Sequence, residues 1–349
     1  MTEKIEVLYA SDENYLRQTI ISATSLLIFA STAPTYEYVI HLFLLDVSEA
    51  STTKAVQRLE AVRPCTVKVH AFTTETLNMG AFPSWRGGLG AYLRFFALDV
   101  LPELDWIAYF DADTLFCDDI VKFWHLRDEA MWVQGQHDFT AFHFGELFYG
   151  QEPIEFQRNY ICSGVLLMNL KALRANDFSG KWRLFPREYG TSRFPDQSIL
   201  NVLSVGHRAD LPPQWGALCV DFPKDVSLIH YTHFKPWRLN SHAEKRILKC
   251  IPDVVVAWKL FVEACCPSDI DLTVASIPWL TYMRGRMNFW IKSRGSQKTW
   301  ERKRKGKSEA DRIILTGLER LRFPLGVFKR KLQDALERLQ RASSEADRL

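Results

Sequence analysis

The stretch Trp106-Ile107-Ala108-Tyr109-Phe110-Asp111-Ala112-Asp113-Thr114 is an apolar, aromatic run that ends in two carboxylates with one residue between them. Read as a strand, the run is buried and the carboxylates emerge at its carboxyl end, where open α/β sheets place ligand sites. Two anionic side chains this close repel each other unless a cation lies between them. Their oxygens suit Mg²⁺ or Mn²⁺ bound to a diphosphate. The alternative is a strand followed by an acidic turn, because Asp also favours turns and helix N-caps.

Strand-like and helix-like segments alternate through the first two thirds of the chain. Apolar residues spaced by three and four, such as Leu16, Ile20 and Ala23, indicate a helix. The predicted strands are 6–10, 38–45, 66–72, 106–110, 131–136, 160–170 and 226–231. The predicted helices are 16–31, 51–63, 91–99, 196–205 and a short one after residue 120. This alternation predicts an α/β fold with a mostly parallel, Rossmann-like sheet flanked by helices.

The composition fits a globular protein with a sizeable core. The chain has 349 residues, of which 47% are hydrophobic and 24% charged. Its seven cysteines are scattered, without a Cys-x-x-Cys pair, which suggests reduced thiols in a reducing compartment and therefore a cytoplasmic protein. We expect no signal peptide and no transmembrane helix, because no long uncharged apolar run is present.

The charge is divided unevenly. Residues 1–240 hold 21 Lys and Arg against 28 Asp and Glu, a net of −7, whereas residues 241–349 hold 23 against 13, a net of +10. We therefore predict two regions, an α/β domain over 1–245 and a basic, helical C-terminal region over 246–349. A basic region on an acidic body suggests an anionic surface as its partner.

The C-terminal region combines a basic run with an apolar helical face. Residues 292–307 carry eight Lys or Arg against one Glu, and Pro324 should break or kink the helix that follows. The apolar positions, spaced by three and four, are Leu318, Leu321, Leu325, Phe328, Leu332, Leu336 and Leu339. We expect this region to hold the protein on the inner face of the cell membrane. The alternative is that the apolar face packs on the protein's own body or on a second copy. The run lacks the repeated aromatic residues on which nucleic-acid bases stack, so no nucleic-acid partner is expected.

Six segments, in this order along residues 5–240, resemble glycosyltransferase family 8. They are Tyr9-Ala10-Ser11-Asp12-Glu13-Asn14-Tyr15, Tyr92-Leu93-Arg94, Phe110-Asp111-Ala112-Asp113, Ser163-Gly164-Val165-Leu166-Leu167-Met168-Asn169, Pro195-Asp196-Gln197-Ser198-Ile199-Leu200-Asn201 and Ile229-His230-Tyr231 through Lys235-Pro236-Trp237. This family contains retaining transferases of the GT-A fold, including bacterial lipopolysaccharide galactosyl- and glucosyltransferases and glycogenin. The resemblance implies a metal-dependent transfer of galactose or glucose from a UDP-sugar to a glycan acceptor such as lipopolysaccharide.

The resemblance also implies roles for individual residues at the diphosphate. Asp111, Asp113 and His230 would bind the metal, and a nitrogen ligand favours Mn²⁺ over Mg²⁺. Lys235 would add a positive charge to the phosphates. His230 could instead be a satisfied histidine at a strand end.

The donor's base and sugar would meet other residues. Asp12 and Tyr15 would bind the uracil, unless they are a turn carboxylate and a helix-flanking aromatic. Arg94 and Asp138 would bind sugar hydroxyls or phosphate, although Arg94 could be a surface charge on its helix. The remaining residues expected to line the donor are Ala10, Ala112, Ser163 and Gly164.

Asp196 and Gln197 open a predicted helix, where Asp is also a good N-cap. In the functional interpretation, Asp196 binds sugar hydroxyls and Gln197 lies near the anomeric carbon. A neutral amide is a weak nucleophile, which argues against a double displacement and favours front-face attack. Gln197 would then stabilise the oxocarbenium-like state through its carbonyl dipole.

Two positions depart from the family pattern. Cys162 stands where the family usually has Asn before Ala-Gly-Val-Leu-Leu, so the donor-sugar preference is open. The closing motif is one residue short and has His233 at its glycine position; either the His233 side chain reaches the phosphate or the loop closes differently.

A second interpretation belongs to a different class of protein. A catalytically degenerate domain of this fold could serve as a membrane or protein scaffold. The joint presence of both Asp residues, His230, Gln197 and Lys235 favours the enzyme.

Overall fold

The computed structural model describes residues 2–77, 79–80, 82, 89–138, 160–190, 194–218, 225–232, 235–238, 252–273 and 325–346. The chain divides into two compact units. The first contains Met1–Ala112 and Asp119–Trp215, and the second contains Asp113–Asp118 and Gly216–Leu349. The domain boundary expected at residue 245 stays a prediction.

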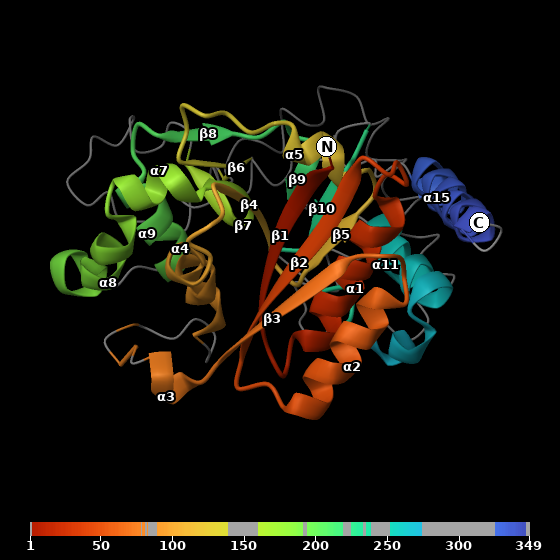
Figure 1. The fold of residues 1–349 in the computed structure, drawn as a ribbon, viewed down its shortest axis with the longest axis horizontal. Coiled ribbons are helices and arrows are strands. Elements are labelled where there is room, and N and C mark those ends of the chain that lie inside the picture. Colours follow the sequence, from red (N-terminus) through yellow and green to blue (C-terminus); the bar gives the residue numbers. More distant parts are fainter. Residues whose placement is uncertain are drawn as a thin grey trace, which may run out of the picture. The chain divides into compact units, whose positions relative to one another are not determined.

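A seven-stranded sheet forms the centre of the first unit (Figure 1). Its strands are β1 (Glu3–Asp12), β2 (Tyr36–Leu45), β3 (Thr66–Phe72), β4 (Trp106–Phe110), β6 (Val133–His137), β7 (Ile161–Asn169) and β8 (Arg208–Asp210), in the order β3-β2-β1-β4-β7-β6-β8. Parallel pairing joins β1 to β2 and β4, β2 to β3, and β6 to β8. Only β7 runs antiparallel to its neighbours β4 and β6 among these strands. The predicted mostly parallel sheet is therefore confirmed.

Helices of the first unit pack on both faces of this sheet. They are α1 (Leu16–Phe29), α2 (Glu49–Glu60), α3 (Thr74–Leu77), η1 (Gly90–Phe96), α4 (Ala97–Val100), α5 (Ile120–Trp124), α7 (Leu170–Ala175), α8 (Phe178–Tyr189) and α9 (Pro195–Leu203). The Tyr9 hydroxyl lies 3.1 Å from Ser22 Oγ of α1. The preceding residue, Leu8, belongs to the hydrophobic core that contains Tyr92 of η1, so the two residues of β1 face different helices. Covering both faces explains why strands such as β4 read as continuous apolar runs.

Helix α8 was not predicted from the sequence, because Gly180 and Pro186 interrupt its pattern. It forms because Phe178, Trp182 and Phe185, spaced by four and three, are buried on one face. Asp177 caps its start in the left-handed conformation at φ 51° and accepts a hydrogen bond of 3.2 Å from the Gly180 backbone N–H.

The second unit contains a three-stranded sheet in the order β5-β10-β9. Its elements are β5 (Thr114–Phe116), β9 (Trp215–Leu218), β10 (Leu228–His230), α11 (Pro252–Cys265), η3 (Pro267–Leu272) and α15 (Leu325–Ala346). Strands β5 and β10 are antiparallel, with Thr114 opposite His230. The helix break expected at Pro324 stays a prediction, because Pro324 and the predicted helical positions before it lie outside the described residues.

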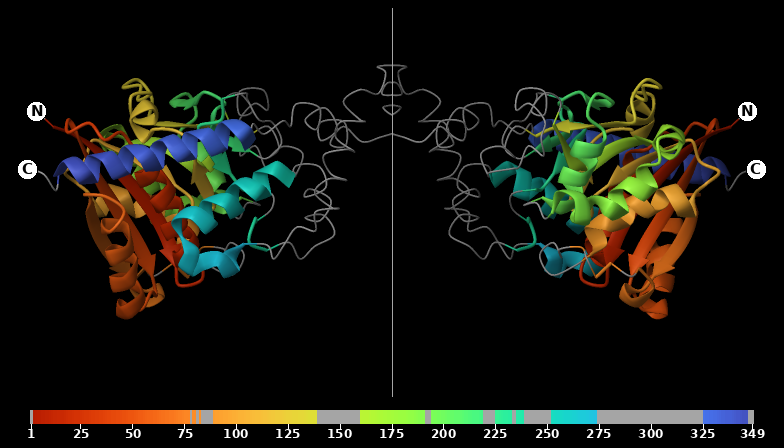
Figure 2. Two further views of the ribbon diagram at one scale, coloured as in Figure 1. Left: turned by 90° about the vertical axis from the view of Figure 1, so that its right-hand side faces the viewer. Right: turned by 90° about the vertical axis from the view of Figure 1, so that its left-hand side faces the viewer.

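Helix α15 packs on its own unit, beside α11 (Figure 2). Phe328, Leu332 and Ala335 are buried along one face, and Lys331 Nζ lies 3.5 Å from the Val226 carbonyl and 3.8 Å from Asp118 Oδ2. This part of the apolar face is therefore covered by the chain itself, which supports the alternative to membrane insertion for these residues. The basic run 292–307 lies outside the described residues. In the portion of the chain that the structure describes, we find no helix with the length and apolarity needed to cross a membrane.

We predict that Leu332→Ala destabilises the protein by about 2–5 kcal/mol, because it removes a buried side chain from the interface of α15 with its unit. Gln333→Ala is the matched control on the exposed face of the same helix, with an expected change within about 0.5 kcal/mol. Urea unfolding and limited proteolysis of the C-terminus measure both. Equal stability of the two variants would show that α15 does not depend on this packing.

Candidate active site

Arg94 is the centre of a polar cluster in the first unit. Helix η1 carries it, and the side chain is 3% exposed. Its Nε donates to the Ala91 carbonyl at 2.8 Å, and Nη1 donates to the Ser163 carbonyl. Nη2 lies 3.1 Å from Asp111 Oδ1 and 3.3 Å from Asp196 Oδ2. The guanidinium therefore bridges two carboxylates, and the alternative that Arg94 is a surface charge is wrong.

Hydroxyl groups hold both of these carboxylates. The Tyr109 hydroxyl donates to Asp111 Oδ1 at 2.7 Å, and Ser163 Oγ donates to Asp196 Oδ2 at 2.7 Å. The backbone N–H of Asp111 also donates to the Gly164 carbonyl at 2.8 Å, which ties the end of β4 to β7.

The charges of this cluster compensate one another. Burial favours the neutral form of Arg94, but the nearby Asp111 and Asp196 carboxylates raise its pKa above the ordinary value, so it stays charged. Burial raises the pKa of Asp196 above its ordinary value, although Arg94 and the Ser163 hydroxyl favour the carboxylate. Burial likewise raises the pKa of Tyr109 well above its ordinary value, so its hydroxyl remains a donor.

Gln197 connects the same cluster to Asp138. Its Oε1 accepts from the Ser163 backbone N–H at 3.2 Å, and its Nε2 donates to Asp138 Oδ2 at 3.0 Å. A backbone donor at one end and a carboxylate acceptor at the other assign the amide orientation. The N-cap of α9 is Phe194, so the alternative role of Asp196 as an N-cap is wrong.

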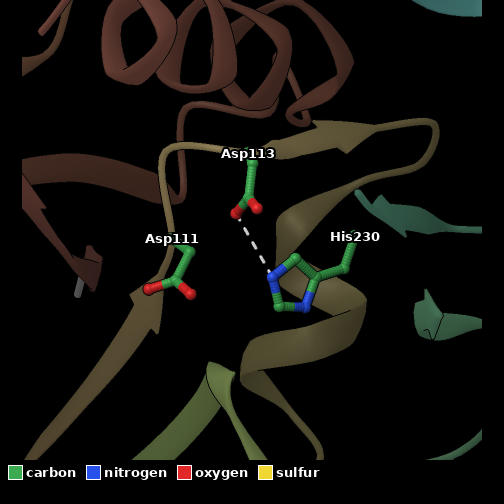
Figure 3. A group of neighbouring side chains, drawn as sticks. All are labelled: Asp111, Asp113 and His230. Atoms are coloured by element: carbon green, nitrogen blue, oxygen red, sulfur yellow. Dashed lines mark ion pairs between the residues drawn. The ribbon is translucent and has the colours of Figure 1, made fainter. Parts of the chain in front are cut away.

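A second cluster lies within the second unit. Asp113 and His230 are buried, and His230 Nε2 lies 3.2 Å from Asp113 Oδ1, as drawn in Figure 3 with Asp111 two residues earlier in the chain. Lys235 Nζ pairs with Asp113 Oδ2 and donates to the Tyr231 carbonyl at 2.9 Å. Burial favours the protonated form of Asp113, but Lys235 and His230 hold its pKa well below the ordinary value. Asp113 is therefore an anion with two cationic or polar partners.

Aromatic packing supports this second cluster from α11. The Tyr231 hydroxyl donates to the Val254 carbonyl at 3.0 Å, and the Trp258 ring meets the rings of Tyr231 and Trp237 at centroid distances of 5.6 and 4.9 Å. The Tyr231 backbone N–H in turn donates to the Asp113 carbonyl at 2.9 Å. Helix α11 thus packs against Tyr231 and Trp237.

Asp111, Asp113 and His230 each offer an atom that binds metals. Two ligands at right angles on an ion, each at about 2.1 Å, stand about 3 Å apart. The 3.2 Å between His230 Nε2 and Asp113 Oδ1 fits such a pair. Two carboxylates and an imidazole suit Mn²⁺. The residues therefore fit a divalent metal ion.

The expected nucleotide loop has a turn of its own. Asp12 Oδ1 accepts from the Tyr15 backbone N–H at 3.0 Å, so Asp12 does act as a turn carboxylate. Asp12, Tyr15 and Ala10 are half-buried at the carboxyl end of β1. Cys162, Ala112 and Gly164 are buried, and His233 lies outside the described residues.

Two polar residues of the first cluster were missed in the sequence analysis. Tyr109 is two positions before Asp111, and the period of two in a strand could have placed both on one face. Asn201 follows Gln197 by four residues on α9; its side chain accepts from the Ile161 N–H at 2.8 Å and donates to the Ile161 carbonyl at 2.7 Å. That helical spacing was the available signal.

Known proteins share this fold. The galactosyltransferase LgtC, solved in complex with donor and acceptor sugar analogues, superposes with a TM-score of 0.58 at 19% identity, covering 70% of this chain and 94% of LgtC. GlyE of Streptococcus pneumoniae TIGR4, a glycosyltransferase, gives a TM-score of 0.51 at 18% identity, covering 78% of this chain and 66% of GlyE. These likenesses define the fold as that of GT-A glycosyltransferases.

Sequence relatives give the same class. The lipopolysaccharide 1,2-glucosyltransferase of Escherichia coli (strain K12) is 24% identical over 255 residues, which cover 68% of this chain and 73% of that protein. The probable galacturonosyltransferase-like 4 of Arabidopsis thaliana is 24% identical over 267 residues, which cover 68% and 75%. The chain is therefore a glycosyltransferase. The family model for glycosyl transferase family 8 matches residues 6–241, and the chain belongs to this family.

We predict that Arg94→Met destabilises the protein by about 3–5 kcal/mol, because it leaves the buried Asp196 and the half-buried Asp111 without their shared cation. Arg183→Met is the control: Arg183 is 40% exposed and pairs with Asp99 at 2.6 Å, so its loss should cost about 1 kcal/mol or less. Urea unfolding of both variants measures the difference. A small loss for Arg94→Met would contradict the bridging role.

Proposed function

We propose that this chain transfers a hexose, with retention of configuration, from a UDP-sugar to a saccharide or glycolipid acceptor in a Mn²⁺-dependent reaction. The observation that carries the proposal is the buried cluster of Arg94, Asp138, Asp196 and Gln197, which pairs with Asp111 at the carboxyl end of β4, in a family 8 chain. Such strand ends are where α/β sheets bind ligands. The similarity to a lipopolysaccharide glucosyltransferase supports a glycolipid acceptor and glucose as the donor sugar, with galactose as the alternative.

In this proposal the diphosphate meets the metal and Lys235. Asp113 and His230 are paired in the second unit. Asp111 is two residues before Asp113, so their Cα atoms are at most about 7 Å apart. These three residues would hold the ion, which supplies Lewis-acid stabilisation of the departing diphosphate. The cationic Lys235 adds a charge-assisted contact to the same phosphates.

The sugar meets the first cluster. Asp196 and Asp138 offer carboxylate oxygens for hydroxyl groups, and Arg94 holds Asp196 in place. Gln197 is a neutral amide fixed at both ends, so it is a weak nucleophile and a well-oriented dipole. We therefore favour front-face attack, in which a phosphate oxygen of the donor takes the proton of the acceptor hydroxyl.

We predict that Asp111→Asn and Asp113→Asn each lower the rate of transfer by about a hundredfold or more, the scale of losing a main electrostatic stabiliser. UDP-hexose hydrolysis and Mn²⁺ titration measure the loss. Asp99→Asn, an exposed carboxylate paired with Arg183, is the control and should retain full activity. Near-normal turnover of either variant in Mn²⁺ would rule out the metal assignment.

We predict that Gln197→Ala lowers kcat while leaving KM for the donor nearly unchanged, because it removes an interaction made mainly in the transition state. Gln134→Ala is the matched control. Gln134 is also buried and bonds backbone groups at both amide ends, Asp128 N–H at 2.8 Å and the Leu126 carbonyl at 2.9 Å. A raised KM with normal kcat would instead make Gln197 a binding residue.

The scaffold interpretation predicts a different outcome for the same assay. A screen of UDP-hexoses for hydrolysis needs no acceptor and reveals the donor sugar. A catalytically degenerate domain would neither bind UDP nor show turnover that depends on Mn²⁺. The relatives named as transferases favour the enzyme.

We also propose that the protein is cytoplasmic and peripheral on the inner face of the cell membrane, held by the basic run 292–307. Eight basic residues near an anionic surface contribute roughly 1 kcal/mol each. Because α15 packs on its own unit through Phe328 and Leu332, charge in this run is the better-supported source of attraction.

We predict that full-length protein co-sediments with phosphatidylserine vesicles at low salt and is released by added salt. Replacing the eight basic residues by Gln should abolish co-sedimentation without changing donor hydrolysis. This variant keeps α15, whereas truncation near residue 280 would remove it. Failure of the full-length protein to bind at low salt would leave the membrane proposal without support.

A further inference from the structure

Tyr109 and Asp111 lie on the same side of β4 and its extension. Successive side chains of a strand alternate between faces, so residues two apart stand about 7 Å from each other. A tyrosine is long enough to reach the carboxylate two positions on. The Tyr109 hydroxyl does so, at 2.7 Å from Asp111 Oδ1, and the tyrosine side chain is 1% exposed.

The hydroxyl acts together with Arg94. Arg94 Nη2 donates to the same oxygen, Asp111 Oδ1, at 3.1 Å, and its guanidinium lies 4.1 Å above the centre of the Tyr109 ring. One aromatic side chain thus packs under the cation by its ring and meets the carboxylate by its hydroxyl. Two donors on one oxygen restrict rotation of the carboxylate, which a single donor would leave freer.

We propose that Tyr109 is a positioning residue for the metal ligand Asp111, holding its carboxylate in the orientation that binds the divalent ion. This inference rests on the proposed function, since it needs Asp111 to be a ligand. Partners that hydrogen-bond ligating carboxylates orient them, and their loss typically costs ten- to a hundredfold in metal affinity or activity. Tyr109 touches Asp111 and Arg94 and makes its contribution through them.

The test compares Tyr109→Phe with Tyr38→Phe. The first substitution keeps the aromatic ring under Arg94 and removes only the hydroxyl. Tyr38 is also buried, and its hydroxyl donates to the Ser31 carbonyl at 2.9 Å. Tyr38 is near the start of β2, and because β2 and β4 run in the same direction, it lies far from the carboxyl end of β4. Both substitutions remove the hydrogen bond of one buried hydroxyl group, so they should lower the melting temperature by similar amounts.

The readouts are Mn²⁺ binding, from the electron paramagnetic resonance signal of the free ion, and the Mn²⁺ dependence of UDP-hexose hydrolysis. Tyr109→Phe should raise the Mn²⁺ concentration at half-saturation about tenfold in both, with partial recovery of turnover at high Mn²⁺. Tyr38→Phe should leave both unchanged. In an Asp111→Asn background, Tyr109→Phe should have no further effect on Mn²⁺ binding, because the group it orients is gone.

Two failures are distinguishable. If the unmodified protein neither binds Mn²⁺ nor hydrolyses any UDP-hexose with it, the proposed function and this inference both fall. If the unmodified protein does both and Tyr109→Phe matches it, or matches Tyr38→Phe, only the inference falls. An additive effect of Tyr109→Phe on Mn²⁺ binding in the Asp111→Asn background also overturns it.

Discussion

A single buried guanidinium organises the cluster of the first unit. Arg94 forms ion pairs with Asp111 and Asp196 together, and it favours the carboxylate form of Asp196 against the effect of burial. Three elements meet at this cation: η1 supplies it, β4 leads to Asp111, and α9 presents Asp196. The sequence segments that carry these residues are far apart, so the ion pairs are a tertiary constraint on where each segment must lie.

Sharing one cation also links the two carboxylates thermodynamically. A cation that binds Asp111 would weaken the Arg94–Asp111 ion pair and strengthen the Arg94–Asp196 ion pair. By reciprocity, a ligand that weakens the Arg94–Asp196 pair would strengthen the Arg94–Asp111 pair. In the proposed reaction Asp111 faces the metal and Asp196 the sugar, so occupation of one half of the donor site would alter affinity for the other half. The buried Ser163, bonded to Arg94, Asp196 and Gln197, stiffens this connection.

Long buried segments were predictable from the sequence, and short or irregular ones were not. Strand β4 was predicted with its observed bounds because five apolar residues are buried on both faces. Strands β5 and β8 have three residues each, which is too short to show the alternating pattern of a strand in the sequence; they form by pairing with neighbouring strands. For the site, motifs found Arg94, Asp196 and Gln197. They did not reveal that Arg94 bridges two carboxylates, because that depends on the approach of η1 to the end of β4 and to α9.

Helix α15 changes how the basic run should be regarded. Residues 252–272 and α15 belong to the same unit, and α15 packs on α11. In the sequence, the run 292–307 lies between these two elements. A surface that bound this run would hold the enzyme through the chain on both sides of the run, which restricts rotation of the enzyme more than a single connection does.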